Sequence, residues 1–414
     1  MAAAASKASG VETRIGAIAR RWAGEESSGV RAAPPLSLYV HLPWCIRKCP
    51  YCDFNSHAVP GGDEVPEQRY LDALRADLEA ALPQVWGRPV QTIFIGGGTP
   101  SLFSADSIDA LLTMLRTLLP VAPGAEITME ANPGTFEAQR FRAFAQAGVT
   151  RLSIGVQSFD DEALRRIGRV HDATQARQAI ETAAQHFDTW NLDLMYALPG
   201  QSPDALLADL REALSYAPPH LSFYHLTLEP NTAFAMHPPV LPDEDAASEM
   251  QSLIEEEAQR AGLQHYEVSA YARGHHRCVH NLNYWQFGDY LGLGAGAHGK
   301  LSFQDRIVRE ARVRNPREYM RAALGEASEG PIASSHPVPA RELPFEFMLN
   351  ALRLSDGVPA AWFVERTGLS TLAIAEPVGR AVGRGLLDPD PTVYRATPLG
   401  ARFLNDLQQM FLPE

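Results

Sequence analysis

The sequence predicts an α/β protein whose main domain is an open, partial (βα)6 barrel. Along its first two thirds, short apolar runs rich in β-formers alternate with amphipathic helical patterns, which implies parallel strands joined by right-handed crossovers. Six such units are present, fewer than the eight that close a complete barrel. Polar residues also follow the strands at one common end, where barrel proteins gather their ligand-binding groups.

Each element of the barrel follows from hydrophobic periodicity. Ile108, Leu111, Leu112 and Leu115 repeat with the period of about 3.6 residues that is typical of a helix. The expected strands are Ser37–His41, Thr92–Ile95, Glu126–Glu130, Arg151–Gly155, Trp190–Met195 and Leu221–Leu228. The expected helices are Gln68–Leu82, 108–119, Glu137–Ala147, Thr174–Gln185, Pro203–Ser215 and Asp243–Ala261.

Changes in composition divide the chain into five parts. Residues 1–35 are rich in Ala, Ser and Arg and have little to bury, so we expect a disordered leader. The partial barrel spans residues 36–270, and an aromatic, glycine-rich extension spans 271–324. Residues 325–340 are rich in Gly, Ser and Pro, which predicts a linker. The last part, 341–414, is expected to form a separate helical domain.

The last part shows a helix–hairpin–helix order that resembles a winged helix. Its expected elements are helices Pro344–Arg353, Ala360–Thr367 and Leu372–Arg384, a strand at Val393–Ala396 and a helix at Arg402–Phe411. Within the expected recognition segment, only Arg380 and Arg384 are basic. Because DNA binding rests on contacts between basic side chains and phosphates, we expect no nucleic-acid partner here.

Composition excludes several classes of function. The net charge of −13 provides no broad basic field for nucleic acid. No run of about 18 apolar residues is present, so no membrane span is expected. Four cysteines in 414 residues are too few for a disulfide framework and suit a reducing compartment, which predicts a cytoplasmic protein. A monomer or homodimer, and peripheral contact with membrane-bound partners, are left open.

Three of the four cysteines, Cys45, Cys49 and Cys52, lie within eight residues in a C-x3-C-x2-C pattern. Three thiolates this close together suit three irons of a cubane [4Fe-4S] cluster, whose fourth iron then stays open to a small molecule. A zinc site is the alternative, because His41 and His57 flank the triplet. Analysis for iron and sulfide would separate the two.

Further polar groups lie near the ends of the expected strands. Gly96–Gly98 follows the second strand and permits close approach of the backbone. Glu130 ends the third strand, while Asp193 alternates with apolar neighbours in the fifth and should face the barrel interior. Gln157 and Arg169 could hold a carboxylate. The alternative for the two acidic residues is a structural cap or a pair with arginine.

Together these features resemble the coproporphyrinogen-oxidase-like branch of the radical S-adenosylmethionine (SAM) superfamily. The resemblance runs from about Pro34 to the C-terminus. The motifs that support it are Leu38–Cys45, Phe94–Pro100, Met129–Gly134, Ile154–Phe159 and Asn191–Gly200. It implies a radical SAM barrel with SAM chelated to the open iron. The SAM contacts that it implies are Tyr39, Tyr51, Gly98, Thr99, Glu130, Gln157, Arg169 and Asp193.

One departure distinguishes the enzyme of this branch from its haem chaperones. The oxygen-independent coproporphyrinogen oxidase has a further cysteine two residues after the third cluster cysteine, and here that position is Phe54. The segment Cys52–His57 instead resembles the haem-chaperone family HemW. The resemblance therefore implies a protein that carries haem to an acceptor protein, with a radical SAM coproporphyrinogen III dehydrogenase as the alternative.

A second motif supports this resemblance, because HemW proteins have an H-N-x-x-Y-W sequence linked to haem binding. Here it consists of His280, Asn281, Tyr284 and Trp285. The histidine could ligate haem iron, and the two aromatic rings could line the porphyrin. The alternative is a satisfied histidine beside core aromatic residues.

Two neighbouring segments bear on the same question. His275, His276 and Cys278 are rival candidates for the haem ligand. The run Gly294-x-Gly296-x-x-Gly299 matches a dinucleotide fingerprint, but no helical pattern follows it, so we expect no dinucleotide there.

Overall fold

The computed structural model describes residues 30–59, 64–134 and 138–413. Most of the expected leader, including residues 1–29, lies outside these ranges. Val30 is buried, and its backbone N donates a hydrogen bond to the Phe303 carbonyl over 2.8 Å. The leader prediction is therefore wrong for residue 30, because an apolar side chain there packs against the C-terminal core.

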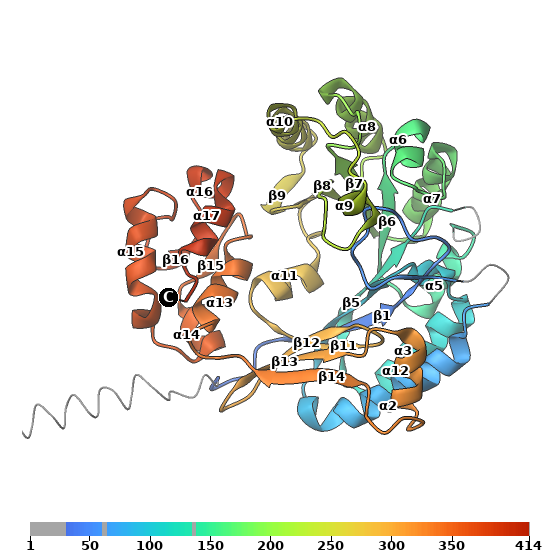
Figure 1. Cartoon of the computed structure of the whole chain (residues 1–414), viewed down its shortest axis with the longest axis horizontal. Coiled ribbons are helices and arrows are strands. Elements are labelled where there is room, and N and C mark those ends of the chain that lie inside the picture. Colours follow the sequence, from blue (N-terminus) through green and yellow to red (C-terminus); the bar gives the residue numbers. More distant parts are fainter. Residues whose placement is uncertain (1–29, 60–63, 135–137, 414) are drawn as a thin grey trace, which may run out of the picture.

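Within the described residues, twelve strands form one sheet at the centre of the molecule (Figure 1). Six of them run parallel as neighbours and confirm the six predicted strands. They are β1 (Leu36–Leu42), β4 (Val90–Gly97), β5 (Val121–Ala131), β6 (Arg151–Gln157), β7 (Thr189–Tyr196) and β8 (His220–His225).

Helices cover the outer face of these strands, at the positions that periodicity predicts (Figure 1). They are α2 (Glu67–Val85), α3 (Ala105–Leu118), α5 (Phe141–Ala147), α7 (Ala173–His186), α8 (Pro203–Ser215) and α10 (Glu244–Arg260), with the short α6 (Asp161–Arg166) and α9 (Ala233–Met236) between them. The Ser104 hydroxyl caps α3, whose apolar stripe is buried as expected. The expected start of the third helix at Glu137 lies outside the described residues.

The sheet continues beyond the barrel at both edges. On the β8 side it adds β10 (Ala270–Ala272) and β9 (Gln264–Glu267). On the β1 side it adds β11 (Asp289–Leu293), β12 (His298–Ser302), β13 (Ile307–Arg312) and β14 (Ile332–Pro337). The extension at 271–324 therefore continues the barrel sheet.

The linker prediction for residues 325–340 is wrong where β14 forms. This strand pairs antiparallel with β13, and all six of its residues are exposed. An edge strand of this kind buries neither face, so it leaves no hydrophobic alternation in the sequence. Backbone hydrogen bonds to β13 place it in the sheet, together with one from the Ser335 hydroxyl to Glu310 Oε1 over 3.1 Å.

A buried ionic group anchors the added strands to the barrel. Arg312 on β13 is 1% exposed, and its Nε lies 3.1 Å from Oδ1 of Asp77 on α2. The hydroxyl of Tyr319, on α12 (Pro316–Ala323), donates to the same carboxylate over 2.8 Å. Removal of one member of such a pair typically costs about 3–5 kcal/mol, because the other charge stays buried without a partner.

The C-terminal domain lies at one side of the barrel and has its own core, which includes Phe347, Phe363 and Leu407 (Figure 1). Its elements are α13 (Leu343–Ala351), β15 (Val358–Pro359), α14 (Ala361–Thr367), the 3₁₀ turn η2 (Thr371–Ile374), α15 (Ala375–Gly383), β16 (Val393–Tyr394), α16 (Pro398–Arg402) and α17 (Leu404–Gln409). The helix α11 (Val279–Trp285) contacts both this domain and strand β4. None of the helices described is both long and apolar enough to cross a membrane.

Candidate functional site

Two cavities meet near the carboxyl ends of the central strands. The first, here called the cluster cavity, has a volume of 360 Å³ and is lined by the three clustered cysteines and by residues of strands β4 to β8. The second, here called the aromatic cavity, has a volume of 650 Å³ and lies against β1, β11, β12 and β13. The two share four lining residues: Asp53, Phe54, Gly97 and Glu130.

The three cysteines lie on the loop after β1. This loop is held at its base, where β2 (Trp44–Cys45) pairs with β3 (His57–Ala58). Each thiol has a polar neighbour: Thr99 Oγ1 is 3.5 Å from Cys45 Sγ, Arg169 Nη1 is 3.8 Å from Cys49 Sγ, and Ser56 Oγ is 3.7 Å from Cys52 Sγ. Hydrogen-bond donors beside sulfur stabilise thiolate ligands, so the arrangement suits an iron–sulfur cluster.

The two histidines that flank the triplet already have protein partners. The ring nitrogens of His41 lie 3.0 Å from the Tyr39 hydroxyl and 2.9 Å from the Asn55 carbonyl, and burial lowers the His41 pKa to about 4. Nε2 of His57 lies 3.3 Å from the Asn55 side-chain oxygen. In the described ranges, no three His, Cys, Asp or Glu side chains form a group that could hold one metal ion. Since each cysteine of a cubane binds a different iron, the thiols fit a cluster better than zinc.

Two half-buried carboxyl groups face the cluster cavity from neighbouring strands. The backbone N of Gly97 donates to Glu130 Oε2 over 3.0 Å, yet burial and, to a smaller extent, the charge of Asp193 raise the Glu130 pKa to about 7. Asp193 accepts from Ser153 Oγ and Asn191 Nδ2 over 2.8 and 2.7 Å, and burial raises its pKa too. A positively charged ligand in this cavity would stabilise both ionised forms.

Three buried polar atoms on the wall of the cluster cavity have no hydrogen-bond partner among the described residues: Thr128 Oγ1, Arg151 Nη2 and Arg169 Nε. The rest of the Arg169 guanidinium is fixed, because Nη2 donates to Asn132 Oδ1 and to the Gly155 carbonyl over 2.6 and 2.7 Å. Since buried polar atoms are normally paired, these orphaned atoms indicate that a polar ligand fills the cavity.

The backbone around the cavity is tightly constrained. A side chain at Gly98 would come within 2.5 Å of the Trp44 carbonyl oxygen, so only glycine lets the run after β4 approach the cysteine loop. Gln157 has φ of 69° at the end of β6, a left-handed conformation that costs a non-glycine residue about 1–3 kcal/mol. Strain of this kind concentrates at ligand sites.

The structure brings most of the predicted site residues together. The cluster cavity is lined by Cys45, Cys49, Cys52, Tyr51, Gly98, Thr99, Glu130, Gln157, Arg169, Asp193 and Asn281. The aromatic cavity is lined instead by Tyr39, Tyr284 and Trp285. Tyr39 therefore does not share a cavity with the three thiols. His280 lines neither cavity.

His280 is a satisfied core histidine in this structure, as the alternative interpretation of its motif expected. Its Nδ1 lies 2.8 Å from Thr92 Oγ1, its Nε2 lies 2.9 Å from the Tyr284 hydroxyl, and the residue has no exposed surface. Burial lowers its pKa to about 3. Both ring nitrogens are therefore engaged, and neither is directed at a cavity.

The rival haem ligands are no better placed. Cys278 lines the cluster cavity, but its thiol donates to Glu126 Oε1 over 3.6 Å, and burial raises its pKa to about 12. His276 Nδ1 lies 2.8 Å from Thr189 Oγ1, and its ring packs against that of His275. Neither of these two histidines lines the aromatic or the cluster cavity.

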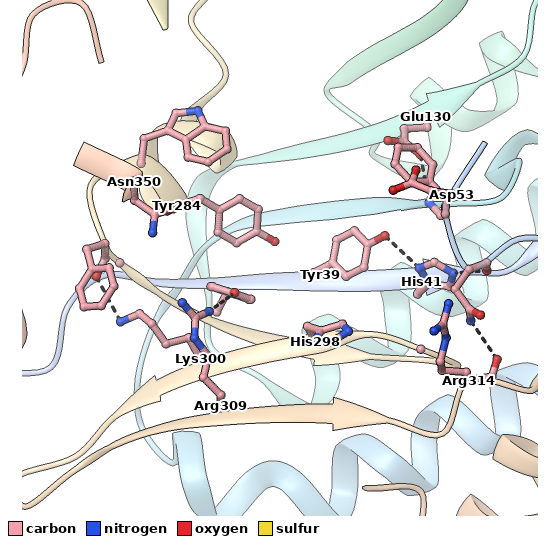
Figure 2. Close-up of a pocket in the computed structure, with 18 residues that line it drawn as sticks. Tyr39, His41, Asp53, Glu130, Tyr284, His298, Lys300, Arg309, Arg314 and Asn350 are labelled. Carbon is pink, nitrogen blue, oxygen red and sulfur yellow. Dashed lines mark hydrogen bonds between the residues drawn. The ribbon is translucent and has the colours of Figure 1, made fainter. Parts of the chain in front are cut away.

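Sequence reasoning missed four basic residues of the aromatic cavity: His298, Lys300, Arg309 and Arg314 (Figure 2). His298 begins β12 and Gly299 is its second residue, so a strand and not a helix follows Gly294 and Gly296. The sequence signal for two of these basic residues was the alternation of His298 and Lys300 around Gly299, which places both side chains on one face of a strand. Asn132, within the motif Met129–Gly134, was also missed as a partner of Arg169.

Comparison with known proteins gives a consistent relationship. The family model "Radical SAM superfamily" matches residues 39–213, and "HemN C-terminal domain" matches residues 338–403. The chain is 48% identical to the haem chaperone HemW of Escherichia coli over 92% of its own length and 99% of that protein. It is 33% identical to the haem chaperone HemW of Bacillus subtilis over 91% of its length and 99% of that protein.

Among solved structures, the chain is similar to the coproporphyrinogen III oxidase HemN of Escherichia coli, a radical SAM enzyme. The TM-score is 0.76, with 22% identity over 92% of this chain and 90% of that one. This similarity extends to the fold, including the parallel partial barrel and the C-terminal extension.

Proposed function

The chain belongs to the HemW family of the radical SAM superfamily, and we propose that it is a haem chaperone that holds a [4Fe-4S] cluster and SAM and passes haem to an acceptor protein. One observation carries this proposal. A wide aromatic cavity that includes Tyr284 and Trp285 adjoins the cluster cavity, and Phe54 stands in their shared wall, where coproporphyrinogen oxidase has its extra cysteine.

Within the cluster cavity, each group has a role that its chemistry supports. Cys45, Cys49 and Cys52 would ligate three irons of the cluster, which leaves an iron to which SAM can bind. Glu130 and Asp193 would bind the positively charged part of SAM, and Arg169 would hold its carboxylate through the unpaired Nε. Tyr51, Gly98, Thr99, Gln157 and Asn281 would complete the walls.

The haem would occupy the aromatic cavity, where Tyr284 and Trp285 offer flat apolar faces. We assign the protein to the cytoplasm, since its thiols suit a reducing compartment.

Anaerobic titration with haem tests this function. We expect saturation at about one haem per chain, and replacement of Trp285 by alanine should weaken affinity about two- to twelvefold, because a ring contact contributes about 0.5–1.5 kcal/mol. The matched control is Trp86→Ala, since Trp86 is 80% exposed and lines neither cavity. Binding that never saturates, or an equal loss in the two variants, would rule out a specific haem site here.

A further inference from the structure

His298 presents its imidazole to the aromatic cavity with its ring exposed. Figure 2 shows the ring beside β12, with Tyr39 above it in this view, Tyr284 and Arg309 to its left and Arg314 to its right. No hydrogen bond to its ring nitrogens occurs within the described part of the chain. In this respect His298 differs from His280, whose two nitrogens are both engaged.

The residues that flank His298 on the two neighbouring strands have small side chains or none, and with His298 they form what is here called the floor of the aromatic cavity. The neighbour of His298 on β13 is Ala311, and on the other side Gly292 of β11 is so close that a side chain there would collide with the His298 backbone. Tyr39 follows next, because β1 pairs it with Gly292. A flat ligand could therefore lie over the small residues Ala311 and Gly292, with the imidazole of His298 projecting towards it from between them.

The turn before His298 is held rigidly. Gly294 and Gly296 have φ of 101° and 77°, and the Ala295 backbone between them donates to the Tyr70 hydroxyl and accepts from Asn55 Nδ2, over 2.8 and 2.9 Å. Side chains on these glycines would collide with the His41 carbonyl and with Asn55. A ligand residue on a rigid support loses little entropy when it binds.

The basic groups around the floor differ in how they are engaged. Arg309 pairs with Glu346 over 2.7 Å, and buried Lys300 pairs with Asp289 over 3.0 Å. Arg314 is exposed, lines the cavity, and has no carboxylate partner within hydrogen-bond distance in the described ranges. Its guanidinium is therefore the one of these three that is available to a ligand carboxylate.

From these positions we propose that His298 is the axial ligand of the haem iron in the aromatic cavity, and that Arg314 pairs with a haem propionate. This inference rests on the proposed haem-binding function and adds the residues that hold the group. An imidazole supplies the iron ligand, the aromatic walls cover the porphyrin, and a free guanidinium pairs with a carboxylate. His280 then has a positioning role, because it orients Tyr284 through their hydrogen bond.

Titrations with haem and with iron-free protoporphyrin IX separate the two contributions. The variant His298→Ala should weaken haem binding at least tenfold and lose the imidazole-ligated Soret band, yet bind protoporphyrin IX as wild type does. Added imidazole should restore the haem spectrum. Arg314→Gln should weaken both porphyrins several-fold and leave the haem spectrum unchanged, and it should not affect the dimethyl ester of haem.

Controls keep the outcomes distinct. His275→Ala should match wild type, and His298→Met should shift the Soret band to that of a thioether-ligated haem, which shows a folded site. Iron and sulfide content should be equal in all variants, because His298 does not line the cluster cavity.

Loss of the imidazole band in His280→Ala but not in His298→Ala would overturn the inference. So would a His298→Ala protein with the wild-type spectrum and affinity, while the chaperone function would stand. A wild-type protein that binds no haem would instead defeat the proposed function itself.

Discussion

Alanine at Cys45, Cys49 or Cys52 is expected to abolish the broad absorption near roughly 400 nm that thiolate-bound iron–sulfur clusters show. Each thiol lines the cluster cavity and has its own hydrogen-bonding neighbour, so each would bind a separate iron. Loss of any one ligand leaves a second iron exposed, and the cluster should fail to assemble. Iron and sulfide analysis after anaerobic reconstitution measures this directly.

The fourth cysteine provides the control. Cys278 is buried and donates to Glu126, and burial keeps its pKa high, so Cys278→Ala should retain iron, sulfide and absorption. A wild-type protein with stoichiometric zinc and no sulfide would contradict the cluster assignment. So would a single-cysteine variant that keeps the full iron content.

Replacement of Glu130 by glutamine is expected to weaken SAM binding about 10- to 150-fold, because a hydrogen bond to a charged group contributes about 1.5–3 kcal/mol. The amide retains the shape and the contact with the Gly97 backbone but removes the negative charge. The response of the reduced cluster's EPR spectrum to added SAM measures the affinity. The cluster itself should remain fully loaded.

The pH profile gives this prediction a second readout. The pKa of Glu130 is about 7 before the ligand binds, so the carboxyl group is largely protonated at lower pH. A cationic ligand favours the ionised form, and SAM affinity should therefore fall as pH decreases through 7 and level off above it. The profile of Glu130→Gln should be flat over this range.

A buried carboxyl group elsewhere serves as the matched control. Burial raises the pKa of Asp209 to about 6, but Asp209 lines neither cavity and accepts from Ser158 and Phe159. Asp209→Asn should retain the wild-type pH profile. If Glu130→Gln shows the wild-type profile as well, Glu130 does not contact the ligand.

The sequence alone predicted the barrel and the cluster cavity well, for a local reason. Strands such as β1 and β7 have one fully apolar face and a second face that carries polar groups, and the helices between them have a strong 3.6-residue period. The cavity lies where these strands end, so residues such as Glu130 and Asp193 converge once the strand order is known. The resemblance of the motifs to radical SAM proteins then indicated SAM as the ligand of these residues.

The aromatic cavity could not be predicted in the same way. It depends on the antiparallel addition of β12 and β13 to β11, which places His298 beside Gly292 and Ala311. Hydrophobic periodicity in the sequence does not indicate which of these strands pair with one another. The sequence left two interpretations of His280 open and could not name its partner Thr92, which lies 188 residues away in the chain.

The central claim is that this chain carries haem and does not oxidise coproporphyrinogen III. Its most direct test is anaerobic incubation of the reconstituted, reduced protein with SAM and coproporphyrinogen III, beside the coproporphyrinogen III oxidase of Escherichia coli as a positive control. We expect no decarboxylated product, while the same preparation binds about one haem per chain. Phe54 in the shared wall, in place of a cysteine, is the structural reason. Formation of the divinyl product with consumption of SAM would contradict the account and make the chain an enzyme.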